Sequence, residues 1–374
     1  MKRILLVTRP IAPPWDEASK NFAYTLAKSF GAQENLELHL MTRGILLELP
    51  KNVIQEDIYT SSENDFKFSQ KIRSLFFQFK NRNKFDIAHY FFTPAKLNSF
   101  VIKNFIRNNK TKTIQTVATL REDIHSDEEI KKLMFADKII TYSDYAKNKL
   151  NLLGFNNAKR IYPGIDLENY KPATCNLQLI TYNLRQGDFV VTFPGEYARL
   201  GATDDIVNMI IQYTSILKQN NIKIVFACRI KNNADHKKKE EAMKKLQENN
   251  CLDPAVFTDT VFDVAKIYNM SDVIIFPVQN MQGKFDVPLA VIEPMACEKP
   301  VIISDLPILR EFAKPEHSVI IKKGNVEQLK NAILDLYNNP ERRTALGKNA
   351  RKFVEENFDI KKIAEEYKKI YETL

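Results

Sequence analysis

The 374-residue sequence lacks any apolar run of about 18 residues, so no segment has the length and composition of a membrane-spanning helix. The first residues become polar at Thr8, too soon for a secretory signal peptide. The cysteines are few, widely spaced and in no metal-binding pattern; they are Cys175, Cys228, Cys251 and Cys297. We therefore expect a cytoplasmic protein with reduced thiols.

Glycine and paired acids are scarce as well. The sequence has only 10 glycines and none before Gly31, so the loop after the first predicted strand is not glycine-rich. Without glycine a backbone cannot approach a phosphate closely, and side chains must supply the contacts there. No Asp-x-Asp pair occurs anywhere in the sequence. We therefore expect any anionic ligand to meet cationic side chains and a helix N-terminus rather than a divalent metal.

Positive charge is in excess. The net charge of +9 suits an anionic substrate, an anionic membrane or nucleic acid, and equally a lysine-rich solvated surface. Lysines interleave with glutamates in residues 236–249 and 355–374, a pattern typical of exposed helix faces. We expect no nucleic-acid partner, because the sequence has neither an RNA-binding aromatic signature nor zinc-finger spacing.

One predicted helix, residues 64–82, combines cations with large apolar side chains. Phe68, Ile72, Phe76 and Phe79 recur at helical spacing. Basic residues lie in or beside the same helix: Lys71, Arg73, Lys80, Arg82 and Lys84. Two interpretations remain open, a helix that lies peripherally against an anionic membrane and a solvated helix whose phenylalanines pack into the core.

Strands and helices alternate along the whole chain, which predicts an α/β fold with doubly wound parallel sheets. A turn-rich segment, residues 162–172, separates two such runs. The predicted strands are 3–8, 36–41, 86–92, 113–120 and 138–142, then 189–193, 223–227, 255–258, 272–277, 301–304 and 318–321. The predicted helices are 18–30, 64–82, 97–107, 127–135 and one after Ser143, then 203–218, 236–249, 262–269, one from Pro288, 306–312, 325–338 and 356–372.

Residues 271–305 have the clearest functional pattern. An apolar strand is followed by a polar loop, and Pro288 then opens a helix where its missing N–H costs nothing. A helix N-terminus at the carboxyl end of a parallel strand favours an anionic ligand, phosphate above all. Lys284 and Asp286 stand in the loop, and Glu293 lies one to two turns into the helix, where its carboxylate can accept hydrogen bonds from a diol such as a ribose.

This stretch resembles the donor-site signature of glycosyltransferase family 4, the retaining, nucleotide-sugar-dependent enzymes of GT-B fold. Residues 293–301, Glu-Pro-Met-Ala-Cys-Glu-Lys-Pro-Val, match the second half of that signature. The first half departs, since Phe285 stands where the family has a glutamate. Weaker similarities lie in residues 136–143, 161–166 and 193–199, in the family's order. The resemblance implies two Rossmann-like domains with an interdomain cleft, an acceptor domain of residues 1–164 and a donor domain of residues 165–355, with a helix of residues 356–374 packing back on the first.

The resemblance also implies roles for individual residues. On the donor side Glu293 would hold the ribose beside Leu289, and Lys284 would contact a phosphate. Arg199, near Gly195, and Arg229, at the end of the next strand, would bind the diphosphate. Glu196 stands where the family usually has an arginine after that glycine. The expected catalytic residues are Asp286, on the transferred sugar, and Arg121, where the family often has a histidine. The alternatives are a glutamate that the helix dipole favours for Glu293 and plain surface arginines for Arg199 and Arg229. For Lys284, Asp286 and Arg121 the alternative is an ordinary loop ion pair.

The acceptor side is expected near the first loop. Asp16, Glu17 and Lys20 would face the acceptor there, although helix capping explains them equally well. The implied function is the metal-free, cofactor-free transfer of a sugar from a nucleotide-sugar donor to a hydroxyl acceptor, either a saccharide or a lipid-linked glycan. The alternatives are a GT-B nucleotide-sugar epimerase and a non-catalytic nucleotide-sugar-binding protein.

Overall fold

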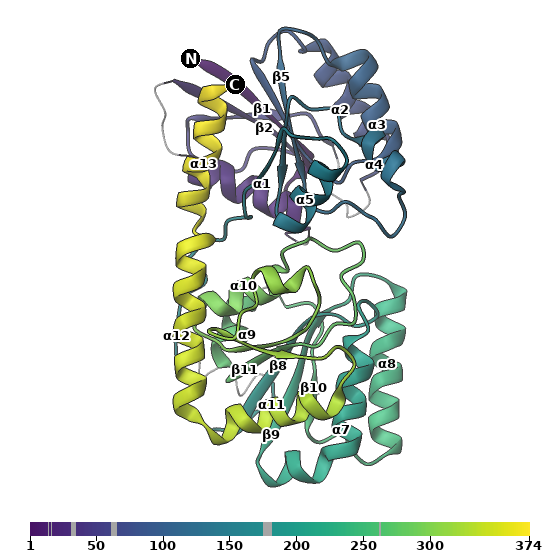
Figure 1. Cartoon of the computed structure of the whole chain (residues 1–374), viewed down its shortest axis with the longest axis vertical. Helices are drawn as coiled ribbons and strands as arrows, with labels where there is room; N and C mark the ends of the chain where they lie inside the picture. The colour runs from purple at the N-terminus through teal and green to yellow at the C-terminus, as the bar shows by residue number, and fades with distance from the viewer. Residues whose placement is uncertain (14, 16, 31–34, 61–65, 175–181, 262) are drawn as a thin grey trace. The chain divides into compact units, whose positions relative to one another are not determined.

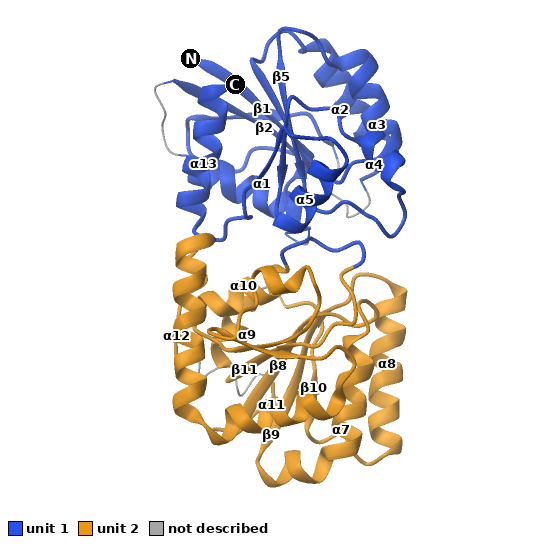
Figure 2. Cartoon of the chain, viewed as in Figure 1, with its two compact units in different colours: residues 1–166, 282–287, 358–374 blue, residues 167–281, 288–357 orange. Residues whose placement is uncertain are grey.

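The structure is a computed structural model that describes residues 1–13, 15, 17–30, 35–60, 66–174, 182–261 and 263–374. The chain forms two compact units (Figure 2). Unit 1 comprises residues 1–166, 282–287 and 358–374, and unit 2 comprises residues 167–281 and 288–357.

Unit 1 is built on a parallel sheet in the order β3-β2-β1-β4-β5-β6-β7 (Figure 1). Its strands are β1 (Lys2–Ile11), β2 (Leu36–Thr42), β3 (Val53–Asp57), β4 (Ile87–Phe91), β5 (Lys112–Val117), β6 (Lys138–Thr141) and β7 (Ala158–Arg160). Its helices are α1 (Ala18–Ser29), α2 (Phe68–Lys80), α3 (Lys96–Val101) with the π-helical turn η1 (Ile102–Ile106), α4 (Asp127–Leu133), α5 (Asp144–Leu152) and α13 (Ile360–Thr373). The strand order reverses direction between β1 and β4.

Unit 2 repeats this plan with a parallel sheet in the order β10-β9-β8-β11-β12-β13. Its strands are β8 (Phe189–Glu196), β9 (Ile222–Arg229), β10 (Ala255–Phe257), β11 (Val273–Phe276), β12 (Val301–Ser304) and β13 (Ser318–Ile321). Its helices are α7 (Ala202–Gln219), α8 (Asn233–Glu248), α9 (Val264–Met270), α10 (Leu289–Ala296), the 3-10 turn η2 (Leu309–Glu311), α11 (Val326–Asn338) and α12 (Pro340–Asn357). Here the order reverses between β8 and β11.

Burial explains why the central strands read as continuous apolar runs. All four residues of β11 are buried, as are all four of β12. A parallel strand is covered by helices on both faces, so it has no solvent face that would favour alternating polar residues. In unit 1 the C-terminal helix α13 packs against α1 and β1. Its Tyr371 donates or accepts a hydrogen bond at 2.7 Å with Nδ1 of buried His89 in β4.

Several predicted elements differ from those observed. Strands β3 and β7 were not predicted, because edge strands bury only part of their side chains and Val53-Ile-Gln-Glu-Asp57 carries little apolar pattern. The predicted helix 306–312 is only the short turn η2, and the chain's end contains α12 and α13 rather than one helix. Residues 64, 65 and 262, at the starts of two predicted helices, lie outside the described part.

Of the two interpretations of residues 64–82, the one that packs the phenylalanines into the core is wrong for three of them. Phe68, Phe76 and Phe79 are 67%, 66% and 47% exposed, whereas Phe77 is partly buried against the core. Their spacing fixed a common face of the helix but not the direction in which that face points.

Candidate active site

The two loops that leave β8 and β11 meet at the point where the strand order of unit 2 reverses. The backbone N–H of Gln279 donates to the carbonyl oxygen of Leu200 at 2.8 Å, and its side-chain amide donates to Oδ2 of Asp205 at 3.0 Å. Gly201 has φ +78°, and a Cβ there would lie 3.0 Å from the Gln279 side chain, so glycine is required. Ligands of open α/β sheets bind at this kind of position.

Glu293 lies on α10 in the same unit, with two tyrosines around its carboxylate. The hydroxyl of Tyr268 donates to Oε2 at 3.0 Å. The rings of Tyr170 and Tyr268 are 6.4 Å apart, and Tyr170 is a second hydrogen-bond partner of the carboxylate. Burial raises the pKa of Glu293 to about 7, although the tyrosine hydrogen bonds act in the opposite direction. A carboxylate in this setting is ready to accept hydrogen bonds from a polar ligand that restores some of its lost hydration.

The N-terminus of α10, the helix that carries this carboxylate, has no side-chain cap. Its N-cap is Pro288, which has no side chain that can cap the first N–H groups. Leu289 is the first residue of the helix and is partly exposed. The helix dipole at this end favours an anion. Lys284 is partly exposed in the preceding loop and belongs to unit 1 by its contacts.

Arg199 and Arg229 are brought together at the ends of β8 and β9, but both face Glu196. Strand register places Glu196 opposite Arg229. Nη2 of Arg229 lies 2.7 Å from Oε1 of Glu196, and Nη1 of Arg199 lies 3.9 Å from Oε2. The Glu196 side chain is only 5% exposed, whereas those of Arg229 and Arg199 are 34% and 38% exposed. Glu196 is therefore an ion-pair partner shared by the two arginines at this edge, directly after Gly195.

Asp286 lies in unit 1, held at the carboxyl ends of β5 and β6. The hydroxyl of Ser143 donates to Oδ2 of Asp286 at 2.7 Å, and the backbone N–H of Asp286 donates to the carbonyl oxygen of Ala118 at 3.0 Å. The ring of Phe285 packs 4.8 Å from that of Tyr142. Asp286 is 4% exposed, so its carboxylate is fixed in orientation by these contacts.

Arg121 follows β5 in the same unit and forms a bidentate ion pair with its neighbour Asp123. Nε lies 2.8 Å from Oδ1 and Nη2 lies 3.0 Å from Oδ2. Arg121 has φ +55°, a left-handed conformation that non-glycine residues rarely adopt. The side chain is therefore engaged locally, as one of the two sequence interpretations had it.

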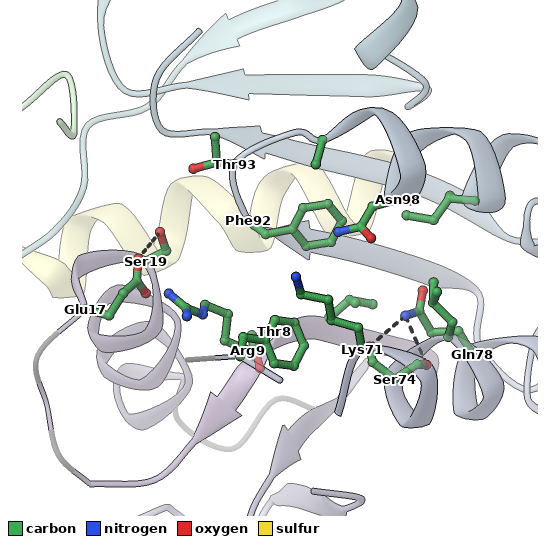
Figure 3. A pocket seen from close by; sticks show the side chains of 15 residues that line it. Thr8, Arg9, Glu17, Ser19, Lys71, Ser74, Gln78, Phe92, Thr93 and Asn98 are labelled. Carbon is green, nitrogen blue, oxygen red and sulfur yellow. Dashed lines mark hydrogen bonds between the residues drawn. The ribbon is translucent and has the colours of Figure 1, made fainter. Parts of the chain in front are cut away.

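A pocket of about 250 Å³ opens where the strand order of unit 1 reverses (Figure 3). It is lined by the end of β1, the start of α1, the residues after β4, and α2 and α3. Its polar lining consists of Thr8, Arg9, Glu17, Ser19, Lys71, Ser74, Gln78, Thr93 and Asn98. Two cations, one carboxylate and two amides suit a hydroxylated ligand that carries negative charge.

Of the two described side chains predicted for the acceptor, Glu17 and Lys20, only Glu17 is part of this lining. It also caps α1, because its Oε2 accepts from the backbone N–H of Lys20 at 2.8 Å. Lys20 is buried, with its ammonium 5.9 Å from the ring centre of Trp15. Asp16 lies outside the described residues.

The partners of the predicted residues were missed by sequence reasoning. Tyr268 and Tyr170 lie 25 and 123 positions before Glu293 and belong to no motif. Glu196 departs from the family pattern without indicating its partners, and Arg9 and Lys71 lie on elements far apart in the sequence. The position of Arg9 at the end of the first strand was the one available signal, since such positions face the ligand edge of the sheet.

Comparison with known proteins extends this description. Residues 187–353 match the family described as glycosyl transferases group 1. An uncharacterised glycosyltransferase of Methanocaldococcus jannaschii is 26% identical over 255 residues, which cover 66% of this chain and 62% of that protein. The alignments to curated relatives span 60 to 64% of the relatives' own length.

Solved structures match the whole chain. Sucrose-phosphate synthase from Thermosynechococcus elongatus superposes with a TM-score of 0.77 at 18% identity, covering 100% of this chain and 99% of that one. Anabaena HepE in complex with UDP and glucose gives a TM-score of 0.77 at 13% identity, with 100% of each chain covered. The predicted fold class is confirmed. Residues 187–353 are thus similar to the glycosyl transferases group 1 family, in a chain of GT-B fold.

Proposed function

We propose that this protein is a retaining glycosyltransferase of the hexosyltransferase type, which moves a sugar from a nucleotide-sugar donor to a hydroxyl acceptor. The observation that carries the proposal is Glu293 on α10, within the residues that match the glycosyl transferases group 1 family. Its carboxylate, bordered by Tyr268 and Tyr170, lies in the helix that follows the loop at the strand-order reversal of unit 2. In this proposal it accepts hydrogen bonds from the donor's ribose hydroxyls.

The donor is proposed to be a nucleoside diphosphate sugar. HepE, one of the structural neighbours, is described in complexes with UDP and with UDP-glucose. A departing nucleoside diphosphate carries about two to three negative charges, which must be balanced as the glycosidic bond breaks. Arg229, Arg199, Lys284 and the N-terminus of α10 supply positive charge without a divalent metal. Glu196 holds the two arginine side chains in place before the donor arrives.

The proposed mechanism retains the anomeric configuration. The acceptor hydroxyl attacks from the face that the diphosphate leaves, so the phosphate oxygen can take the acceptor's proton. Asp286 and Arg121 are each assigned a contact with the transferred sugar, Asp286 through its carboxylate and Arg121 through hydrogen bonds that its guanidinium donates. The fixed orientation of Asp286 on Ser143 supports a positioning contact of this kind.

The acceptor is proposed to bind in the pocket of unit 1 and to be a saccharide or lipid-linked glycan. The amides of Gln78 and Asn98 suit sugar hydroxyls, and Arg9 and Lys71 suit an acidic or phosphorylated group on the same molecule.

The test is a panel of nucleoside diphosphate sugars, followed first by thermal shift and then by mass spectrometry with mixed saccharide acceptors. A ligand at about 100 times its dissociation constant adds about 2.7 kcal/mol to the free energy of unfolding, which a melting curve detects. We expect stabilisation by one nucleotide class and a new glycoside whose anomeric configuration, by NMR, equals that of the donor. Release of an isomerised sugar without an acceptor would indicate an epimerase, and binding without turnover a non-catalytic protein. An inverted product would contradict the mechanism.

A further inference from the structure

The helix α2 turns a polar face toward the protein and an apolar stripe toward solvent. Its inward face is polar, with Gln70, Ser74 and Gln78 only 5%, 6% and 4% exposed. These inward side chains bond to each other and to nearby chain, for example Gln70 Nε2 to Thr60 Oγ1 at 2.9 Å and Gln78 Nε2 to Ser74 Oγ at 3.0 Å. The outward face holds four large apolar side chains, whereas Leu75 and Phe77 pack against the core at the side of the helix. A helix of a soluble protein normally places these two faces the other way round.

The outward stripe consists of Phe68, Ile72, Phe76 and Phe79, whose spacing places them on one side of the helix. They are 67%, 49%, 66% and 47% exposed. No side chain in the described part of the chain covers them to the extent that a core contact would. An exposed row of this size is uncommon in a soluble monomer and marks a contact surface.

The stripe continues onto α3 and the π-helical turn η1, which lie beside α2 (Figure 1). Leu97, Phe100 and Phe105 are 59%, 58% and 54% exposed. The ring centroids of Phe100 and Phe105 lie 6.2 Å apart. Arg82 joins the two parts, since its guanidinium lies 4.6 Å from the ring centre of Phe79 and donates to the carbonyl oxygen of Phe105. We call these seven apolar residues the α2–α3 face. All strongly exposed phenylalanines among the described residues belong to it.

The charge around the α2–α3 face is strongly positive. Residues 66–110 contain ten lysines and arginines and one acid, Asp86, a balance of +9 that equals the net charge of the whole chain. Lys84, Lys96 and Arg107 form ion pairs with acids elsewhere in unit 1. Lys71, Arg73 and Lys80 are exposed on α2 at the edges of the apolar stripe. The positive charge is therefore not an evenly lysine-rich surface but is concentrated beside exposed aromatic side chains.

We propose that the α2–α3 face docks on an anionic lipid bilayer. The apolar stripe would enter the boundary between headgroups and acyl chains, while the flanking lysines and arginines would contact anionic headgroups. When the bulky rings leave water and enter the bilayer to this depth, the burial of their apolar surface lowers the free energy. The concentration of cations selects this occupant over a second copy of the chain, because two such faces would repel each other. The proposal goes beyond the transferase activity and does not depend on it.

Docking would also place the pocket of unit 1 near the bilayer. Lys71, Ser74 and Gln78 line the pocket from α2, and Asn98 and Ile102 line it from α3 and η1. The two elements that carry the exposed stripe are thus also walls of the pocket.

The test is sedimentation of the full-length protein with sucrose-loaded vesicles of pure phosphatidylcholine or of phosphatidylcholine with one-third phosphatidylglycerol. We expect binding to the anionic vesicles only, weakened at least tenfold by the double change Phe68→Ser with Phe76→Ser. The triple change Lys71→Glu, Arg73→Glu and Lys80→Glu should abolish it. Matched controls are Leu47→Ser and Leu152→Ser, at residues 94% and 85% exposed, and Lys237→Glu with Lys244→Glu on α8; these should bind as the wild type does.

A second readout follows insertion directly. Tryptophan emission of a Phe76→Trp variant should shift to the blue on anionic vesicles and be quenched by brominated lipid, whereas the wild type, with Trp15 alone, should show neither. Equal binding to neutral and anionic vesicles, or binding that the α2 variants leave unchanged, would overturn the proposal. The proposal would also be overturned if the wild type were a dimer, the Phe68→Ser, Phe76→Ser variant were a monomer, and neither protein bound vesicles. The face would then be an interface between copies.

Discussion

Replacing Glu293 by glutamine should stabilise the ligand-free protein at alkaline pH while weakening nucleotide binding. In the folded protein burial raises the pKa of Glu293 from the usual 4.5 to about 7. Between these two values the folded protein holds a proton that the unfolded chain has released, so stability from this group falls as the pH rises. The loss of stability is absent below about pH 4.5, where Glu293 is protonated in both the folded and the unfolded state. It reaches its full size above about pH 7.

The size of the effect follows from the shift in pKa. At about 1.4 kcal/mol per pKa unit, the charged carboxylate lowers the free energy of unfolding at pH 8 by at most about 3 kcal/mol. The partial exposure of Glu293 reduces this, so we expect about 2 kcal/mol. Glutamine is neutral at all pH values and can still accept from the hydroxyl of Tyr268. About a quarter of this destabilisation is already present at pH 5, so the variant should gain about 1.5 kcal/mol relative to the wild type between pH 5 and pH 8.

The assay is urea unfolding of both proteins at pH 5 and pH 8, because the difference between the two pH values removes any intrinsic effect of the amide. Glu356→Gln on α12 is the matched control, since that side chain is exposed and its loss of charge involves no burial. A stability difference between Glu293→Gln and wild type that is the same at both pH values would refute the reasoning.

The same substitution should impair the proposed ribose contact. A hydrogen bond to a charged group is worth about 1.5 to 3 kcal/mol, so the dissociation constant of the cognate nucleotide should rise about tenfold or more at pH 8. Wild-type affinity should itself fall below pH 7 as Glu293 takes up a proton, and the variant should lose this pH dependence. Calorimetric affinities that are equal for both proteins would remove Glu293 from the donor site even if its effect on stability were as expected.

Three further outcomes test the rest of the site. Lys284→Ala and Arg229→Ala should each lower turnover about tenfold or more while raising the donor's Michaelis constant less, because charge on the diphosphate develops in the transition state; steady-state kinetics at the wild-type rate in both would place the diphosphate elsewhere. Transfer should persist in excess chelator, and complete loss restored by magnesium or manganese would contradict the metal-free proposal. Glu196→Gln should cost about 1 to 2 kcal/mol in urea unfolding, because Arg229 loses a largely buried partner, whereas Asp305→Asn, which breaks the more exposed pair with Arg310, should cost less than about 1 kcal/mol.

Local patterns were sufficient to predict the α/β fold and the strand, loop and helix around Glu293. A buried parallel strand is a short apolar run wherever it occurs, and Pro288 marks a helix start by its own chemistry. The immediate partners of the site could not be predicted in this way. Glu196 meets Arg229 only because β8 and β9 pair in a register that puts them opposite each other, and Tyr268 reaches Glu293 because α9 packs on α10. Register and helix packing depend on the whole sheet, so no single segment contains that information.

The helix α2 shows a different limit. Its sequence predicts an apolar stripe and a polar stripe, but periodicity alone cannot say which one faces the protein, and the usual assumption buries the apolar one. The pocket reverses that assumption. Lys71, Ser74 and Gln78 line it, and a polar ligand needs hydrogen-bonding groups on its walls. Once the polar stripe faces inward to serve the pocket, geometry forces Phe68, Ile72 and Phe76 outward. The exposure of these side chains then follows from the polar lining that the pocket needs. In the proposed complex the bilayer covers the apolar stripe, so the polar stripe can face the pocket without leaving the apolar stripe in water.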